Sequence, residues 1–141
     1  MQHLRDGLPG CLHGGHRRFA GRNRLLQALA QEGAQVLDLE AIACHRSSVL
    51  GLIPGTPQPT QKAFDTQVWD ALRGFSADRP VFVEAESKKV GNLTVPAELM
   101  VAMRASPCLR VDLSLENRVN LLLEDYAFFT QDRALFAERL E

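Results

Sequence analysis

Apolar residues recur along the chain at two spacings, and these predict helices and strands in alternation. Leu25, Leu26 and Leu29 have the spacing of one helix face. We therefore expect a helix that begins near Asn23 and ends at Gly33, because glycine readily adopts the left-handed conformation that terminates helices. No internal repeat interrupts the pattern.

Three short apolar runs predict buried strands, at residues 36–39, 81–85 and 109–113. The segments between them that are rich in glycine, proline or polar residues are expected to be loops. These loops include residues 45–60 and the polar segment ESKKVGN.

Three more helices are predicted between and after these strands. One begins at Thr60, one has Pro96 at its first position, and one is capped by Ser114. Their apolar faces are Phe64, Val68 and Leu72; Leu99, Met100 and Met103; and Leu115, Val119, Leu122, Tyr126 and Phe129. We expect these faces to contribute to the core.

Alternating strands and helices of these lengths are typical of an α/β domain with a mostly parallel sheet. In such sheets, ligands bind at the carboxyl ends of the strands. The strands predicted to end near Leu39, Val83 and Leu113 lead into polar loops, and the first two loops carry unusual polar clusters. Those two loops are the first candidates for a functional site.

The composition is that of a single globular domain. The chain has 141 residues, of which 45% are hydrophobic and 23% are charged, and a net charge of −1. No apolar run approaches the roughly 18 residues of a membrane-spanning helix, and the first residues lack the apolar stretch of a signal peptide. We therefore expect a cytoplasmic location and no membrane association.

The start of the chain is basic, whereas the remainder is acidic. The first 24 residues contain five arginines and one acidic residue, Asp6. Such a segment can bind phosphate or nucleic acid, although a solvated arm has the same composition. We divide the chain into an irregular basic head at residues 1–22 and an α/β domain at residues 23–141.

The cysteines and histidines form no catalytic or metal-binding pattern. Cys11, Cys44 and Cys108 are widely separated, and no histidine stands at a zinc-ligand spacing from them. We therefore predict no metal site, assign no catalytic residue, and interpret Cys44 and Cys108 as small buried side chains.

The loop before the first predicted helix stands where a phosphate-binding P-loop would lie. That motif reads G-x-x-x-x-G-K-[ST], and this chain reads HRRFAGRN. Gly21 fits the motif, but Arg22 replaces the lysine and His16 replaces the first glycine. Asn23 replaces the hydroxyl residue that would bind Mg²⁺. On this motif alone, the segment would not be assigned as a P-loop, because the wider planar guanidinium of arginine does not reproduce the geometry of the P-loop lysine.

A second polar cluster comprises HRSSVLG and QPTQKAFD, which surround the proline-rich loop. Its hydrogen-bond donors suit a phosphate group or an RNA backbone. A long solvated loop is the structural alternative, although loops of about 15 residues without a function are uncommon.

A third cluster lies in VFVEAESKKVGN. Glu84 and Glu86 are expected to point to the same side of the chain, where two like charges need a cation or a basic partner. For Glu86 we favour a functional role in Mg²⁺ binding or general-base chemistry. For Glu84 we favour a structural ion pair with Lys88, Lys89 or Arg104.

The second and third clusters are expected to meet at one edge of the sheet. Arg46 and Lys62 from one loop, and Lys88 and Lys89 from the other, would then form a single anion-binding site.

Five blocks of the sequence resemble, in order and spacing, the P-loop domain of bacterial tRNA 2-selenouridine synthases. They are LLQALAQEGAQVLDLEAIACHRSSVLG, QPTQKAFDTQVWDAL, PVFVEAESKKVGN, MRASPC and RVNLLLEDYAFF, and they extend from about Leu25 to Phe129. The resemblance implies a P-loop NTPase-like three-layer α/β fold, incomplete in this chain.

The resemblance also implies tRNA as a partner and a transferase activity on the wobble uridine. In that family 2-thiouridine is converted to 2-selenouridine through an S-geranyl intermediate, with selenophosphate and geranyl diphosphate as substrates. The candidates for tRNA or diphosphate binding are His45, Arg46, Ser47, Gln58, Gln61, Lys62, Glu86, Ser87, Lys88 and Lys89.

Two departures from the family pattern leave two functions open. The rhodanese domain with its catalytic cysteine, expected upstream, is absent from this chain. The family's P-loop is expected just before Leu25, so the resemblance implies that HRRFAGRN is a degraded P-loop or a misread one, with Gly21, Arg22 and Asn23 as its candidate nucleotide-binding residues. The chain is therefore interpreted as a fragment of the transferase that contributes tRNA or diphosphate binding. The alternative is a degenerate P-loop remnant or binding module without catalytic activity of its own.

Overall fold

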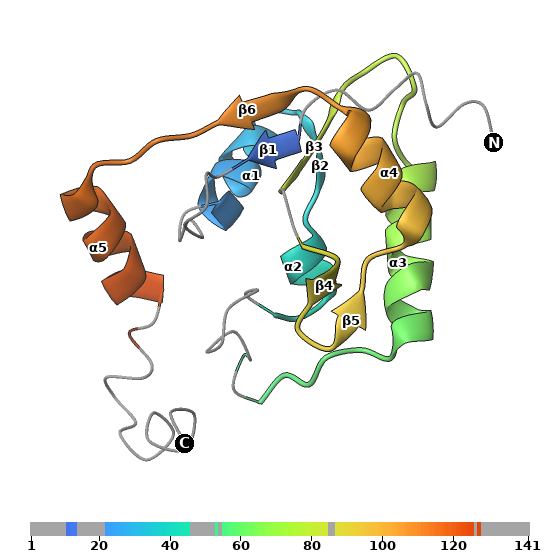
Figure 1. Ribbon diagram of the computed structural model, residues 1–141, viewed down its shortest axis with the longest axis horizontal. Helices are drawn as coiled ribbons and strands as arrows, with labels where there is room; N and C mark the ends of the chain where they lie inside the picture. Colours follow the sequence, from blue (N-terminus) through green and yellow to red (C-terminus); the bar gives the residue numbers. More distant parts are fainter. Residues whose placement is uncertain are drawn as a thin grey trace.

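The computed structural model describes residues 11–13, 22–45, 53, 55–84, 87–125 and 127 (Figure 1). Its elements alternate strands and helices, as the sequence predicts for an α/β domain. In chain order they are β1 (Cys11–His13), α1 (Arg22–Gln31), β2 (Gln35–Leu37), α2 (Leu39–Ile42), α3 (Gln61–Arg73), β3 (Val81–Glu84), β4 (Lys89–Val90), β5 (Leu93–Thr94), α4 (Ala97–Ala105), β6 (Cys108–Arg110) and α5 (Leu115–Asp125).

Four strands form a parallel sheet in the order β2-β3-β1-β6. Strand β1 lies inside the sheet, where Cys11 is aligned with Val83 of β3 on one side and with Cys108 of β6 on the other. The interpretation of residues 1–22 as an irregular head is therefore wrong at residues 11–13. A strand of three residues is too short to show a hydrophobic period, so only its pairing partners reveal it.

Helices cover both faces of the sheet. In Figure 1 the strands β2 and β3 lie between α1 on one side and α3 and α4 on the other. Leu26 of α1 is completely buried, yet it is separate from the large core cluster that α3 and α4 form with the sheet. Each face of the sheet is therefore covered by buried apolar side chains of its own helices.

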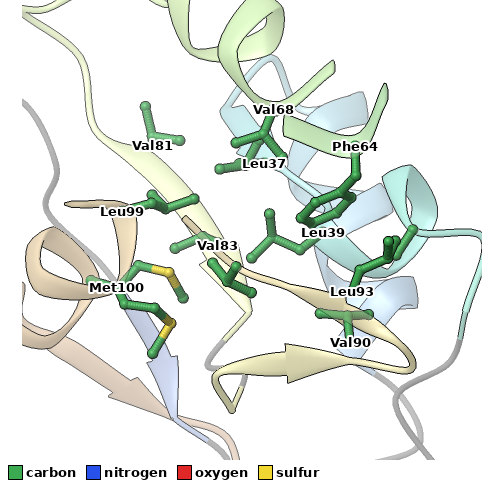
Figure 2. Close-up of a cluster of buried hydrophobic side chains, with 13 residues drawn as sticks. Leu37, Leu39, Phe64, Val68, Val81, Val83, Val90, Leu93, Leu99 and Met100 are labelled. Carbon is green, nitrogen blue, oxygen red and sulfur yellow. The ribbon is translucent and has the colours of Figure 1, made fainter. Parts of the chain in front are cut away.

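The larger core lies between the sheet and the helices α3 and α4 (Figure 2). Phe64 is completely buried there, and Val68 and Met100 lie with it around Val81 and Val83 of β3. Burial of a side chain of this size stabilises the fold by roughly 1.5–3 kcal/mol. The predicted core faces of α3 and α4 are thus confirmed.

The sequence signals for helix ends are confirmed at several positions. The Thr60 hydroxyl accepts a hydrogen bond from the Ala63 N–H at 3.2 Å and begins α3. The Ser114 hydroxyl accepts one from the Asn117 N–H at 3.2 Å, before α5. Gly33, which follows α1, has a φ of +83°.

Three short elements differ from the predictions. The buried strand expected at residues 109–113 is β6 at Cys108–Arg110, and Leu109 of this edge strand is 50% exposed. The expected strand at residues 36–39 stops at Leu37, because the Asp38 carboxylate accepts the Ala41 N–H at 2.8 Å and begins the one-turn helix α2. The expected loop ESKKVGN contains β4, which pairs with β5 as an antiparallel hairpin. Gly91 supplies the positive φ of +61° that this tight turn requires.

Helix α5 is present as predicted, but its apolar face is not buried. Leu115, Val119, Leu122 and Leu123 are all exposed, with 74% exposure at Leu115. Of the residues predicted for this face, Tyr126 and Phe129 lie outside the described residues. Within the described part of the chain, no helix is both long and apolar enough to cross a membrane.

Candidate functional site

A buried carboxyl group lies at the carboxyl edge of the sheet. Glu84 ends β3, next to Leu12 of β1, and its side chain is completely buried. Its Oε1 atom accepts a hydrogen bond from the Glu40 N–H at 2.8 Å, whereas its Oε2 atom has no hydrogen-bond partner among the described residues. Glu84 therefore joins the end of β3 to the start of α2.

Burial raises the pKa of Glu84 to about 8, and the nearby Asp38 carboxylate adds to this rise. The hydrogen bond from the Glu40 N–H opposes the rise. Burial also raises the pKa of Asp38, while the hydrogen bond from the Ala41 N–H lowers it. At neutral pH, Glu84 is thus mainly a neutral carboxylic acid.

This environment corrects the predicted role of Glu84. The described part of the chain contains no ion pair between Glu84 and Lys88, Lys89 or Arg104, and the backbone N–H of Glu40 is its partner instead. The physical reason is burial, because a fully enclosed carboxyl group is more stable with a proton than as an ion. Glu86 lies outside the described residues.

The predicted meeting of the two polar loops is confirmed for the residues that the structure describes. The Gln58 side chain donates hydrogen bonds to the carbonyls of Ala43 and Val90, each at 3.0 Å. Its carbonyl oxygen accepts the Asn92 N–H at 2.9 Å. Gln58 thereby connects the end of α2 to the β4–β5 hairpin.

Gln61 connects the first turn of α3 to the same hairpin. Its amide group donates to the Thr94 carbonyl and accepts the Thr94 N–H, both at 2.8 Å. It also donates to the Asp65 carboxylate at 2.8 Å. Gln61 therefore pairs with Thr94 as a neighbouring strand would, through one donor and one acceptor.

His45 and Gly91 complete this contact. A β-carbon built at Gly91 would lie 2.8 Å from Cδ2 of His45 and would overlap the Gln58 amide. His45 itself is 7% exposed, and burial lowers its pKa. We call Gln58, Gln61 and Gly91 together the hairpin junction.

The predicted lysines lie on the outside of this junction. Lys62 is in the first turn of α3, and Lys88 and Lys89 are at the start of the hairpin; all three are exposed. Lys89 pairs with Thr94, the residue that Gln61 holds. The Ser87 hydroxyl donates to the Lys89 carbonyl at 2.8 Å. The backbone of Lys89 is thus connected through Thr94 to Gln61, the residue that precedes Lys62.

Several predicted residues have no described side chain. Arg22 and Asn23, the last two residues of the P-loop position, form the start of α1. Gly21, Arg46 and Ser47 lie outside the described residues. Their predicted roles in nucleotide, tRNA or diphosphate binding stay predictions.

Among the described residues, no cluster of three or more histidine, cysteine or acidic side chains can hold a metal ion. Cys44 is half-buried, whereas Cys108 is exposed, so the interpretation of Cys108 as a buried residue is wrong. The strand that contains it is at the edge of the sheet, which leaves its side chain open to solvent.

The predicted site residues did not include Asp38 or Gly91. Two local signals would have pointed to them: an aspartate directly after a strand is a favoured helix cap, and a Gly-Asn pair is typical of a two-residue hairpin turn.

The fold and the site define a class of protein. It is a parallel α/β domain with helices on both faces of the sheet and a polar cluster at the carboxyl ends of the strands. Within that class, residues 16–139 match the family model of the tRNA 2-selenouridine synthase AAA domain. The chain belongs to this family.

Curated relatives support the assignment. The chain is 42% identical over 117 residues to a tRNA 2-selenouridine synthase of Pseudomonas syringae, covering 74% of this chain and 32% of that protein. It is 36% identical over 114 residues to the one of Nitrosomonas eutropha, covering 79% and 29%. For Marinobacter nauticus the identity is 32% over 131 residues, covering 87% and 34%.

The chain thus spans about a third of the length of these relatives. The comparison with solved structures gave no match.

Proposed function

We propose that this chain is the part of a tRNA wobble-uridine modifying transferase that binds phosphate groups, either of tRNA or of a diphosphate substrate. Family membership supports a role in tRNA modification. The proposed overall reaction is the conversion of 2-thiouridine to 2-selenouridine through an S-geranyl intermediate. Its proposed substrates are selenophosphate and geranyl diphosphate.

A P-loop NTPase-like fold is part of this proposal. Strand β1, inside the parallel sheet, precedes α1 in the chain, and α1 begins with Arg22 and Asn23 of HRRFAGRN. A phosphate-binding loop requires this strand–loop–helix context, since its backbone amides face the ligand at the start of the helix. The buried carboxyl group of Glu84 ends the strand next to β1.

The observation that carries the proposal is the hairpin junction and the lysines beside it. Gln58 and Gln61 hold the hairpin against the start of α3, and Lys62, Lys88 and Lys89 are exposed around that contact. Lysine ammonium groups bind phosphates by charge and release counterions when they do so. Such contacts fix the position of an RNA backbone without selecting its sequence.

The test is binding of a fluorescent tRNA transcript to the 141-residue chain at several salt concentrations. Replacing Lys62 and Lys89 together by alanine should weaken binding and reduce the salt dependence by a slope of about 2, one for each lost phosphate contact. The matched control is Arg73→Ala, which removes a cation from the last turn of the same helix. Equal effects of the two variants, or none, would contradict the proposal.

A second function is favoured by the start of α1. Arg22 and Asn23 occupy the positions at which an intact P-loop has lysine and a hydroxyl residue. A degenerate P-loop remnant, or a binding module without catalytic activity of its own, would have this sequence. Calorimetric titration with ATP, GTP and geranyl diphosphate separates the two, together with geranylation and selenation assays on thiolated tRNA. Turnover by this chain would exclude the remnant.

A further inference from the structure

Gln58 and Gln61 have no N–H group left for a ligand. A glutamine amide has two N–H donors. Those of Gln58 are used by the carbonyls of Ala43 and Val90, and those of Gln61 by the Thr94 carbonyl and the Asp65 carboxylate. Their side chains therefore serve the fold, although their sequence context suits phosphate binding.

Both glutamines act on the same short hairpin. Strands β4 and β5 contain only two residues each, and two paired strands of this length are not stable alone in water. Gln61 adds a pair of hydrogen bonds to the outer side of β5, and Gln58 adds a pair at the turn. The hairpin also places Val90 and Leu93 in the core.

Gly91 makes the contact at the turn specific for glycine. Its φ of +61° disfavours other residues, and a β-carbon there would overlap the Gln58 amide and approach His45. A residue with a β-carbon at this turn would therefore force the Gln58 amide out of its present position.

From these contacts we infer that Gln58 and Gln61 are positioning residues, which hold Lys88 and Lys89 of the hairpin and Lys62 of α3 in the arrangement that binds phosphate. The inference rests on the proposed function, because it concerns the same lysine surface. It assigns to the two glutamines an effect on tRNA affinity that is exerted through the lysines and not through contact with RNA.

The sharpest control is a third glutamine at the opposite end of the sheet. Gln35 begins β2 and donates hydrogen bonds to the carbonyls of Ser76 and Arg79, at 3.1 and 3.0 Å. It also accepts the Ser76 N–H at 2.6 Å. Gln35→Ala therefore removes the same kind and a similar number of side-chain-to-backbone hydrogen bonds, far along the strands from the lysines.

The experiment compares Gln58→Ala, Gln61→Ala and Gln35→Ala in the full 141-residue chain. Three quantities are measured for each: the thermal midpoint, the hydrogen exchange of the Asn92 and Thr94 amides, and tRNA affinity against salt concentration. We expect faster exchange of these two amides, about tenfold weaker tRNA binding and a smaller salt slope for each of the first two variants. For Gln35→Ala we expect a similar loss of thermal stability with an unchanged salt slope.

Gly91→Ala tests the inference without changing a glutamine, and it should reproduce the exchange and binding defects of Gln58→Ala. If the Gln58 and Gln61 variants alter tRNA binding no more than Gln35→Ala does, the positioning role is wrong while the proposed function stands. If the wild-type chain binds tRNA without any dependence on salt, or not at all, both are wrong.

Discussion

At each end of the parallel sheet, glutamine side chains form hydrogen bonds that hold a neighbouring segment in place. The two ends differ in the charged side chains that surround these contacts. At the amino end, Gln35 holds the turn that contains Ser76 and Arg79. At the carboxyl end, Gln58 and Gln61 hold the β4–β5 hairpin. In each case the glutamine amide, which has two N–H donors and one acceptor oxygen, provides hydrogen-bond partners for backbone groups of that segment.

The difference lies in the charged side chains nearby. At the amino end they are used within the fold, since the Ser76 hydroxyl donates to the Asp78 carboxylate and the Arg79 guanidinium donates to the Gly33 carbonyl. At the carboxyl end, the exposed lysines form no ion pair within the described part of the chain. Glutamine-to-backbone hydrogen bonds thus complete the fold at the amino end. At the carboxyl end they support a lysine surface that is available to anions.

The largest effect should come from the core that both ends share. Phe64→Ala removes a completely buried ring and is expected to destabilise the protein by about 3–5 kcal/mol. Urea denaturation followed by circular dichroism measures the loss. Trp69→Ala, on the same helix at 54% exposure, should cost much less. Similar losses of stability for the two variants would contradict the burial of Phe64 and the exposure of Trp69.

A smaller effect should distinguish the carboxyl end through its dependence on pH. Glu84 has a pKa of about 8 in the folded protein and about 4.5 in the unfolded chain. Between these values the unfolded chain releases a proton that the folded protein keeps, so stability falls as the pH rises from about 4.5 to 8. We expect this carboxyl group to account for a loss of about 2–4 kcal/mol.

Glu84→Gln cannot ionise and should remove that part of the pH dependence. The control is Glu98→Gln, which changes an exposed carboxylate on α4. Unfolding free energies from denaturant titrations between pH 5 and 8.5 provide the measurement. A wild-type chain that gains stability over this range, relative to Glu84→Gln, would rule out a buried neutral acid.

The smallest of the three effects comes from adding one methyl group by a glycine-to-alanine substitution, at the hairpin turn or after α3. Gly91→Ala should destabilise the chain by about 1–3 kcal/mol, because it combines a positive φ with overlap of the Gln58 amide. Gly74→Ala, after α3, should change stability by less than about 0.5 kcal/mol, since the backbone there is right-handed and its nearest contact is at 3.4 Å. Thermal unfolding measures the loss of stability in each variant. A larger loss for Gly74→Ala than for Gly91→Ala would contradict this prediction.

The predictable parts of the fold are those with local signals. Thr60 and Ser114 mark helix starts because their hydroxyls cap nearby N–H groups, and Gly33 marks a helix end by its backbone freedom. Strand β1 could not be predicted, since its three residues gain their conformation from β3 and β6. The apolar period of α5 was visible, but a period does not reveal whether a partner covers it.

The candidate site shows the same division. The meeting of the two polar loops follows from the rule that loops after parallel strands share one edge of the sheet. The roles of Gln58 and Gln61 depend on contacts with Val90 and Thr94, which are distant in the sequence. The burial of Glu84 was also hidden, because glutamate is almost never fully enclosed in proteins.

The central position of β1 determines the order in which the sheet can assemble. Cys11 is near the start of the chain, yet it pairs with Val83 and with Cys108. During synthesis, β2 and β3 can associate around α3 while β1 still lacks its second neighbour, and the sheet is completed only after β6 leaves the ribosome. Contacts between such distant segments slow folding. A nascent chain that has not yet produced Cys108 therefore has one unpaired edge of β1, and an unpaired strand edge favours aggregation.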